Sequence, residues 1–133
     1  MSIVVDTNII AYLYLQNQYT SLAENLLLKY PDWHAPILWK SELRNVLAKY
    51  LRSTILNFDE VLNIQTDAEN LMENKEYQMD SYSVLKLVKE SDCSAYACEF
   101  IAFAKSLNTK LVTLDKKILA EFKDVAVSLE EFV

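Results

Sequence analysis

Residues 2–10, SIVVDTNII, hold the pattern from which the fold is predicted. The β-branched run at 2–6 is typical of a short buried strand, and it ends in an acid. A helix is predicted over 7–17 with no loop before it, because apolar residues recur there at helical spacing, and Thr7 or Asn8 is the predicted cap. A strand that runs directly into a helix is typical of the first half of a βαβ unit.

The same alternation continues to the end of the chain. Further helices are predicted over 19–30, 37–53, 57–73, 81–91, from within 91–100 to about 107, and over 116–122. Further strands are predicted over 32–36, 76–79 and 109–115, with a last strand and tail over 125–133. This order predicts an α/β fold with three α/β/α layers and a central parallel sheet of four to five short strands. The length predicts a single domain, 1–133.

Composition excludes several classes of site. The chain has no glycine, so it has neither a P-loop nor a dinucleotide-binding fingerprint. It has one histidine, which rules out a zinc site built from histidines. The net charge of −6 argues against a general nucleic-acid coat protein. Carboxylates are therefore the expected carriers of any catalysis.

Localisation is predicted from the apolar runs, the first residues and the cysteines. No apolar run reaches the roughly 18 residues of a membrane span, and the start lacks the basic region of a signal peptide. Cys93 and Cys98 are expected to lie on different helix faces as buried thiols. These features predict a cytoplasmic protein with no membrane association.

Three acids are candidates for a shared site. Asp6 and Asp115 each end a predicted strand, and sites in open parallel sheets form beyond the carboxyl ends of strands. Each acid alone is equally explained as a cap of the following helix. Glu42 lies on the edge of the apolar face of the helix over 37–53. Clustered carboxylates favour a bound cation, and oxygen ligands suit Mg²⁺ or Mn²⁺.

At this point three segments, in order, resemble the PIN-domain family, in particular VapC-type toxins. VVDTNII (4–10) resembles the family's first strand and turn, and SELRNVL (41–47) resembles its helix with the second acid. SAYACEFIAFAKSLNTKLVTLDKKIL (94–119) resembles its C-terminal signature. The resemblance covers essentially the whole chain.

The resemblance implies a metal-dependent endoribonuclease. The acids of the family fall on Asp6, Glu42 and Asp115, a supporting hydroxyl falls on Thr113, and a polar residue falls on Asn8. In the implied mechanism Mg²⁺ or Mn²⁺ activates a water that attacks an RNA phosphodiester. The family further implies a homodimer and a small cognate antitoxin whose tail crosses the active-site groove.

The chain departs from the family at one acid. Tyr96, Phe100, Ala102 and Asp115 keep the family's spacing, as does Ala104, but Ala97 stands where an Asp is expected. Ala97 is either a core residue of a diverged relative or a deliberate replacement of Asp. In both cases three of the four expected acids remain, and we expect impaired cleavage.

Two acids, Asp92 and Glu99, lie close enough in sequence to substitute for the missing one. At about 100° per residue, Glu99 lies about 160° from Ala97 on the helix and is expected to point away from the site. Asp92 precedes Ser94, the predicted helix cap, so it can lie in a loop where helical geometry does not fix its direction. It is therefore an alternative metal ligand.

Basic residues are needed to hold an RNA backbone near acids. Arg44 and Lys116 lie nearest to the candidate acids in sequence and are predicted to form the rim for RNA or antitoxin.

Other function classes remain open. A phosphatase with Asp6 as nucleophile is one, although Asn8 stands where that family has a second Asp. A receiver-like signalling domain fits less well, because it needs paired acids at the first strand end. A PIN domain that only binds a partner is the alternative that Ala97 favours.

Overall fold

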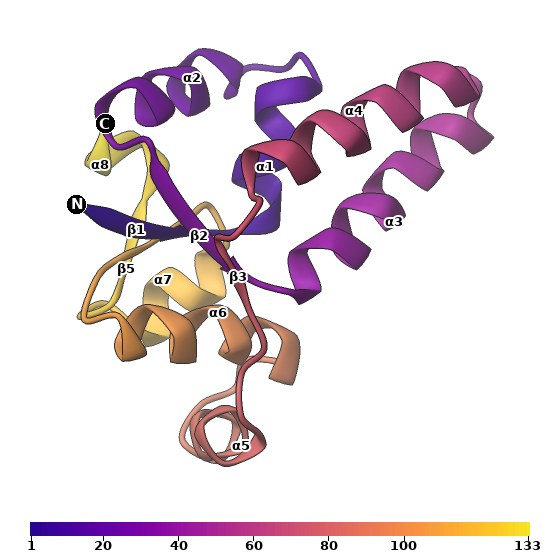
Figure 1. Ribbon diagram of the computed structural model, residues 1–133. Helices are drawn as coiled ribbons and strands as arrows, with labels where there is room; N and C mark the ends of the chain where they lie inside the picture. The colour runs from indigo at the N-terminus through magenta and orange to yellow at the C-terminus, as the bar shows by residue number, and fades with distance from the viewer.

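The computed structural model describes residues 1–133 as five strands and eight helices (Figure 1). The strands are β1 (Ser2–Val5), β2 (Asp32–Pro36), β3 (Glu76–Tyr77), β4 (Leu111–Thr113) and β5 (Ala126–Ser128). The helices are α1 (Thr7–Tyr14), α2 (Thr20–Lys29), α3 (Leu38–Arg52), α4 (Phe58–Leu71), α5 (Ser81–Lys89), α6 (Ala95–Ser106), α7 (Lys116–Glu121) and α8 (Leu129–Phe132).

All five strands form one parallel sheet in the order β3-β2-β1-β4-β5. The chain builds outward from β1 to β3 and then crosses back to place β4 on the other side of β1. The strand order therefore reverses between β1 and β4, and a crevice forms there beyond the carboxyl ends of the strands. The predicted three-layer α/β/α fold with a parallel sheet is confirmed.

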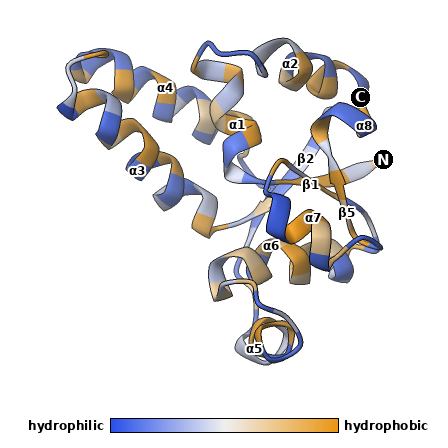
Figure 2. Ribbon diagram, turned by 180° about the vertical axis from the view of Figure 1, so that it is seen from behind, coloured by the Kyte–Doolittle hydropathy of each residue, from blue (hydrophilic) through white to orange (hydrophobic).

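Helices cover both faces of the sheet. α6 packs across β1, β2 and β4, with α5 outside it. α1, α2 and α8 lie together on the opposite side, while α3 and α4 form a hairpin that projects from the sheet edge (Figure 1). Figure 2 shows hydrophobic and hydrophilic residues alternating along these helices, as expected for amphipathic helices between a sheet and solvent. None of the eight helices is long and apolar enough to cross a membrane.

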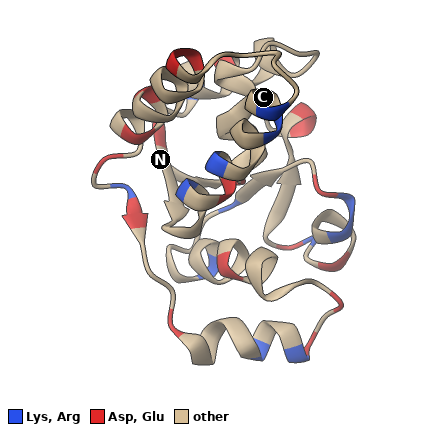
Figure 3. Cartoon of the chain, turned by 90° about the vertical axis from the view of Figure 1, so that its right-hand side faces the viewer, with Lys and Arg blue, Asp and Glu red and all other residues tan.

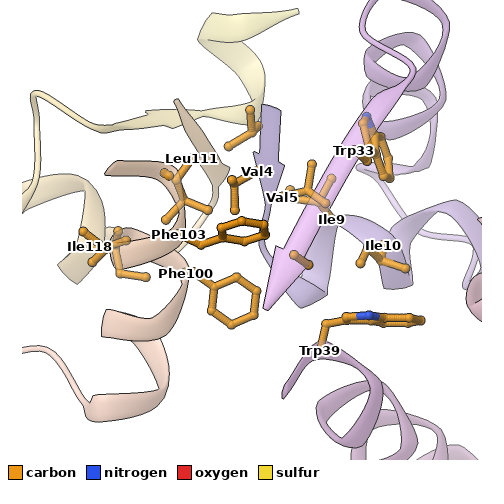
Figure 4. Close-up of a cluster of buried hydrophobic side chains, with 14 of the residues drawn as sticks. Val4, Val5, Ile9, Ile10, Trp33, Trp39, Phe100, Phe103, Leu111 and Ile118 are labelled. Carbon is orange, nitrogen blue, oxygen red and sulfur yellow. The ribbon is translucent and has the colours of Figure 1, made fainter. Parts of the chain in front are cut away.

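The core lies between the sheet and α6 on one face and α1 on the other. Ile3, Val4 and Val5 of β1 are fully buried, since helices cover both sides of this strand. Figure 4 shows Phe100 and Phe103 of α6 beside the strand residues of this core. The strand that carries Asp6 at its end is thus buried over its last three residues.

Some element boundaries differ from those predicted. Asp6, rather than Thr7 or Asn8, is the N-cap of α1, because the strand passes directly into the helix and the first free amide is that of Thr7. α1 ends at Tyr14 rather than residue 17. The predicted tail after the last strand is a short helix, α8, which Ser128 caps.

The chain forms its left-handed positions without glycine. Thr54, Asn74 and Asn108 have φ of 58°, 65° and 52°, and each lies just beyond the end of a helix. Asn tolerates this conformation better than most residues, since its short polar side chain bonds locally. The absence of glycine therefore has a conformational cost that two asparagines reduce.

Two leucines on α2 provide a direct test of the core. Leu26 is fully buried and Leu28 is 83% exposed. Leu26→Ala is expected to lower the free energy of unfolding by about 2–5 kcal/mol, because it removes buried methyl groups and leaves a cavity. Leu28→Ala is the matched control and should change it by less than about 0.5 kcal/mol. Urea unfolding measures both; equal losses would contradict this packing.

Candidate functional site

A pocket of about 570 Å³ opens beyond the carboxyl ends of β1 and β4, where the strand order reverses. Three carboxylates from separate parts of the chain line it: Asp6, Glu42 and Asp115. The other lining residues are Thr7, Asn8, Leu38, Ser41, Asn45, Val46, Ser94, Tyr96, Ala97, Phe100 and Ile118. The structure therefore brings together the three acids that were predicted to share a site.

Strand pairing positions Asp6 and Thr113. β1 and β4 are in register at Val5 and Val112, so the next residues on each strand lie side by side. The Thr113 hydroxyl donates to Asp6 Oδ2 at 2.7 Å, and the Thr7 amide donates to Asp6 Oδ1 at 2.7 Å. Both carboxylate oxygens of Asp6 are thus fixed by hydrogen bonds.

Asp115 is fixed by the helix that it begins. Its Oδ1 accepts hydrogen bonds from the amides of Lys117 and Ile118, at 2.9 and 3.1 Å, as the N-cap of α7. Its own amide donates to the Thr113 hydroxyl at 3.0 Å. Capping and site formation are therefore compatible, since one oxygen caps the helix while the residue still lines the pocket.

Glu42 reaches the pocket from α3 and is held by α1. Its Oε1 accepts a hydrogen bond of 2.6 Å from the Thr7 hydroxyl. The side chain is half-buried, on the edge of the apolar face as predicted.

The pocket is electrostatically unbalanced. Burial raises the pKa of Asp6, hydrogen bonds from Thr113 and Thr7 lower it, and the charge of Asp115 raises it again. Burial likewise raises the pKa of Glu42, against the hydrogen bond from Thr7, and the charges of Asp6 and Glu99 add to the increase. No Lys or Arg lines the pocket, and Figure 3 shows the basic residues scattered over several elements. No basic side chain in the pocket therefore balances the charge of these carboxylates.

The donor set fits Mg²⁺ or Mn²⁺, which prefer oxygen ligands. No three His, Cys, Asp or Glu side chains converge closely enough to form a ready-made coordination group. Mg²⁺ commonly keeps several waters and takes only one or two carboxylates from the protein. A pocket with spaced carboxylates accords with such a hydrated ion and not with a closed metal cage.

Ala97 lies in this pocket, in the first turn of α6, and is partly buried. Its amide donates to Ser94, the predicted cap of this helix. The position at which an Asp was expected therefore faces the three acids.

Neither of the two nearby acids lines the pocket. Asp92 is exposed in the loop before α6, and its amide donates to the Glu121 carboxylate of α7 at 2.9 Å. The suggestion that Asp92 substitutes for the missing acid is thus not supported, because its backbone is tied to a different helix. Glu99 is partly buried and, although outside the lining, its charge raises the pKa of Glu42, so it is less remote from the site than helix phasing predicted.

The two predicted rim residues also lie outside the lining. Arg44 is exposed and lines a separate groove between α3 and α4, beside Leu47 and Phe58. Sequence proximity to Glu42 was misleading here, since residues two apart on a helix face different directions. Lys116 is exposed at the start of α7, next to Asp115 in the chain.

A family model described as PIN domain matches residues 3–127. The chain belongs to the PIN-domain family. Ribonuclease VapC3 of Pyrobaculum aerophilum is 31% identical over an alignment of 127 residues, and the alignment covers 92% of this chain and 95% of that protein. The three segments that suggested this family thus led to the correct assignment.

Solved structures show the same PIN fold at low sequence identity. PAE2754 from Pyrobaculum aerophilum matches with a TM-score of 0.78 at 18% identity, over 99% of this chain and 86% of its own. A toxin–antitoxin complex from Klebsiella pneumoniae matches with a TM-score of 0.66 at 16% identity, over 95% and 96% of the two chains. The feature that these structures share with this chain is the fold.

Sequence reasoning missed one buried residue of this PIN-domain site. Thr7 was considered only as a helix cap, yet its amide and hydroxyl bind two different acids. The available signal was a hydroxyl immediately after an acid at a strand end. Its partner, Glu42, is 35 residues away, which no local pattern reveals.

The raised pKa of Glu42 predicts a stability change with pH. The unfolded chain releases this proton at lower pH than the folded chain, so ionisation favours unfolding as the pH rises through the interval between the two pKa values. Glu42→Gln keeps an acceptor for Thr7 and removes the charge. In a chelator at pH 7 we expect its Tm to rise, because the substituted side chain carries no charge that burial disfavours.

Thermal unfolding at several pH values measures this effect. The gain should disappear well below pH 4.5, the ordinary pKa of a glutamate, where both forms are neutral. Glu24→Gln on the exposed face of α2 is the control and should show a smaller change. A gain that is equal at all pH values would contradict a cost of ionisation.

Proposed function

We propose that this PIN domain is a cytoplasmic, divalent-metal-dependent endoribonuclease, the toxin of a toxin–antitoxin pair. The observation that carries the proposal is the pocket at the reversal of strand order, lined by Asp6, Glu42 and Asp115 without a basic partner. The likeness to Ribonuclease VapC3 supports RNA as the substrate.

Residues 1–133 are proposed to act as one domain, which the single sheet supports. The two free buried thiols accord with a reducing compartment.

The proposed ligands of Mg²⁺ or Mn²⁺ are the same three carboxylates. When bound, such an ion lowers the pKa of a water ligand and stabilises negative charge on a phosphoryl oxygen. The protein's part is to hold Asp6 and Asp115 through Thr113, whose hydroxyl donates to the carboxylate of Asp6 and accepts from the amide of Asp115.

Neutral polar groups complete the proposed site. The side chains of Asn8, Asn45 and Ser41 line the same pocket. They can donate hydrogen bonds to phosphate or ribose oxygens without neutralising the carboxylates. Lys116, exposed beside Asp115, is the remaining candidate for a backbone contact at the rim.

The proposed protein partners are a cognate antitoxin and a second copy of the toxin. Structures with the same fold include a toxin–antitoxin complex from Klebsiella pneumoniae. The acidic pocket of this chain would favour a basic group on the bound antitoxin segment.

Ala97 is proposed to impair cleavage. Its methyl group lies in the pocket with the three proposed ligands, at the position where the family resemblance predicts a fourth oxygen donor. Loss of one ligand should weaken metal binding by at least the roughly 10–100-fold that loss of a supporting hydrogen bond costs. We therefore expect the chain to fold but to cut RNA poorly.

The test of this function is Ala97→Asp, assayed for cleavage of single-stranded RNA with Mn²⁺ and with Mg²⁺. The substituted chain should cut at least about tenfold faster than its parent, in line with the expected change in metal affinity. EDTA should abolish the cleavage, and adding Asp6→Asn should remove the gain.

Ala95→Asp is the matched control, since it adds the same charge to the same turn of α6 at an exposed position outside the pocket. It should give no gain. Absence of cleavage by Ala97→Asp in any divalent ion would contradict the nuclease and favour the second candidate.

The second candidate is a PIN domain that binds its partner without cutting RNA. Ala97 in the pocket is the observation that favours it. The aspartyl-phosphate alternative has less support, because both oxygens of Asp6 accept hydrogen bonds and no lysine lines the pocket.

A further inference from the structure

The buried Thr7 is the residue whose contacts the proposed site leaves unexplained. Only 4% of its surface is exposed. It is the first residue of α1, and its amide donates to Asp6 Oδ1 at 2.7 Å. Its hydroxyl donates to Glu42 Oε1 at 2.6 Å. One residue therefore connects two of the proposed metal ligands.

The direction of these hydrogen bonds is fixed by chemistry. An ionised carboxylate only accepts, so the single hydroxyl proton of Thr7 must point at Glu42. The same holds on the other side of Asp6, where the Thr113 hydroxyl accepts from the amide of Asp115 and donates to Asp6. The result is one continuous chain of hydrogen bonds from Glu42 through Thr7, Asp6 and Thr113 to Asp115.

Glu42 depends on this connection more than the two aspartates do. Asp6 and Asp115 follow strands of one sheet and also accept hydrogen bonds from backbone amides. Glu42 comes from α3, and its carboxylate has no hydrogen-bond partner other than Thr7. A glutamate side chain has several rotatable bonds, so without this contact it loses a defined direction.

We propose that Thr7 is a positioning residue that holds the Glu42 carboxylate in place for the divalent ion. This inference rests on the proposed function and deepens it. Because the hydrogen bond uses Oε1, Oε2 of Glu42 is left without a protein donor and available to the ion. Removing the hydroxyl should weaken binding of the ion by roughly 10–100-fold, the usual effect of losing a group that orients a ligand.

The experiment compares Thr7→Val, Thr7→Ser and a matched control in the full-length chain. Val keeps the shape of Thr and lacks the hydroxyl, whereas Ser keeps the hydroxyl. The control is Thr20→Val: Thr20 is also the first residue of a helix and 4% exposed, and its hydroxyl bonds the carbonyl of Leu15, away from the pocket.

Three readouts separate positioning from a general structural role. Calorimetric titration with Mn²⁺ gives the Kd for the ion, and Tm in a chelator gives stability without metal. RNA cleavage, with kcat and KM, is measured with Ala97→Asp in the background.

Thr7→Val should weaken Mn²⁺ binding and lower kcat by about 10–100-fold, with KM for RNA unchanged. Thr7→Ser should restore both the Mn²⁺ affinity and kcat. Thr20→Val should match the parent in both.

Each contrary outcome has a distinct meaning. If Thr7→Val binds Mn²⁺ and cuts as well as its parent, the positioning role is overturned and the proposed function stands. If neither the unsubstituted chain nor Ala97→Asp binds Mn²⁺ or cuts RNA, the proposed function fails and the positioning role with it. Should Thr7→Val not fold, Thr7→Ala against Thr7→Ser makes the same comparison.

Discussion

The parallel pairing of β1 with β4 is the constraint on which the rest of the site depends. These strands are far apart in sequence, because six helices and two other strands lie between β1 and β4 in the chain. Their register places Thr113 next to Asp6, so that a single hydrogen bond of 2.7 Å joins the two strand ends. A shift of one residue would turn these side chains to opposite faces of the sheet, because strand side chains alternate. The burial of β1 on both sides fixes the register, so the core and the site are specified by the same pairing.

The buried carboxylates of the site lower the stability of the folded chain, which the core provides. Burial raises the pKa of both Asp6 and Glu42, and no basic side chain lines their pocket. Ionising them at neutral pH therefore costs free energy in the absence of a cation. Hydrogen bonds from Thr7 and Thr113 offset part of that cost and fix the oxygens in direction. Such stored electrostatic cost is typical of functional sites, where affinity for a ligand is gained at the expense of stability.

Alanine at position 97 affects both the stability of the metal-free chain and the number of oxygen donors in the pocket. It removes an acid from a pocket already crowded with negative charge, which should favour the folded state without metal. It also offers no oxygen donor at a position that lines the pocket with Asp6, Glu42 and Asp115. The helix that carries Ala97 is otherwise intact, with Ser94 as its cap and Phe100 in the core. The PIN fold is therefore kept with an alanine in the pocket that Asp6, Glu42 and Asp115 line.

The sequence by itself determined the fold class, most of the elements, and the three acids at strand and helix ends. It could do so because strand and helix periodicity and the acids that end VVD and VTLD are local patterns. Only the tertiary structure decided which residues from different parts of the chain contact one another at the site. It joined Thr7 to Glu42 across 35 residues, placed Arg44 in a different groove, and tied Asp92 to α7. The physical reason is that hydrogen bonds between elements depend on strand order and register, and these follow from packing of the whole chain rather than from any one segment of it.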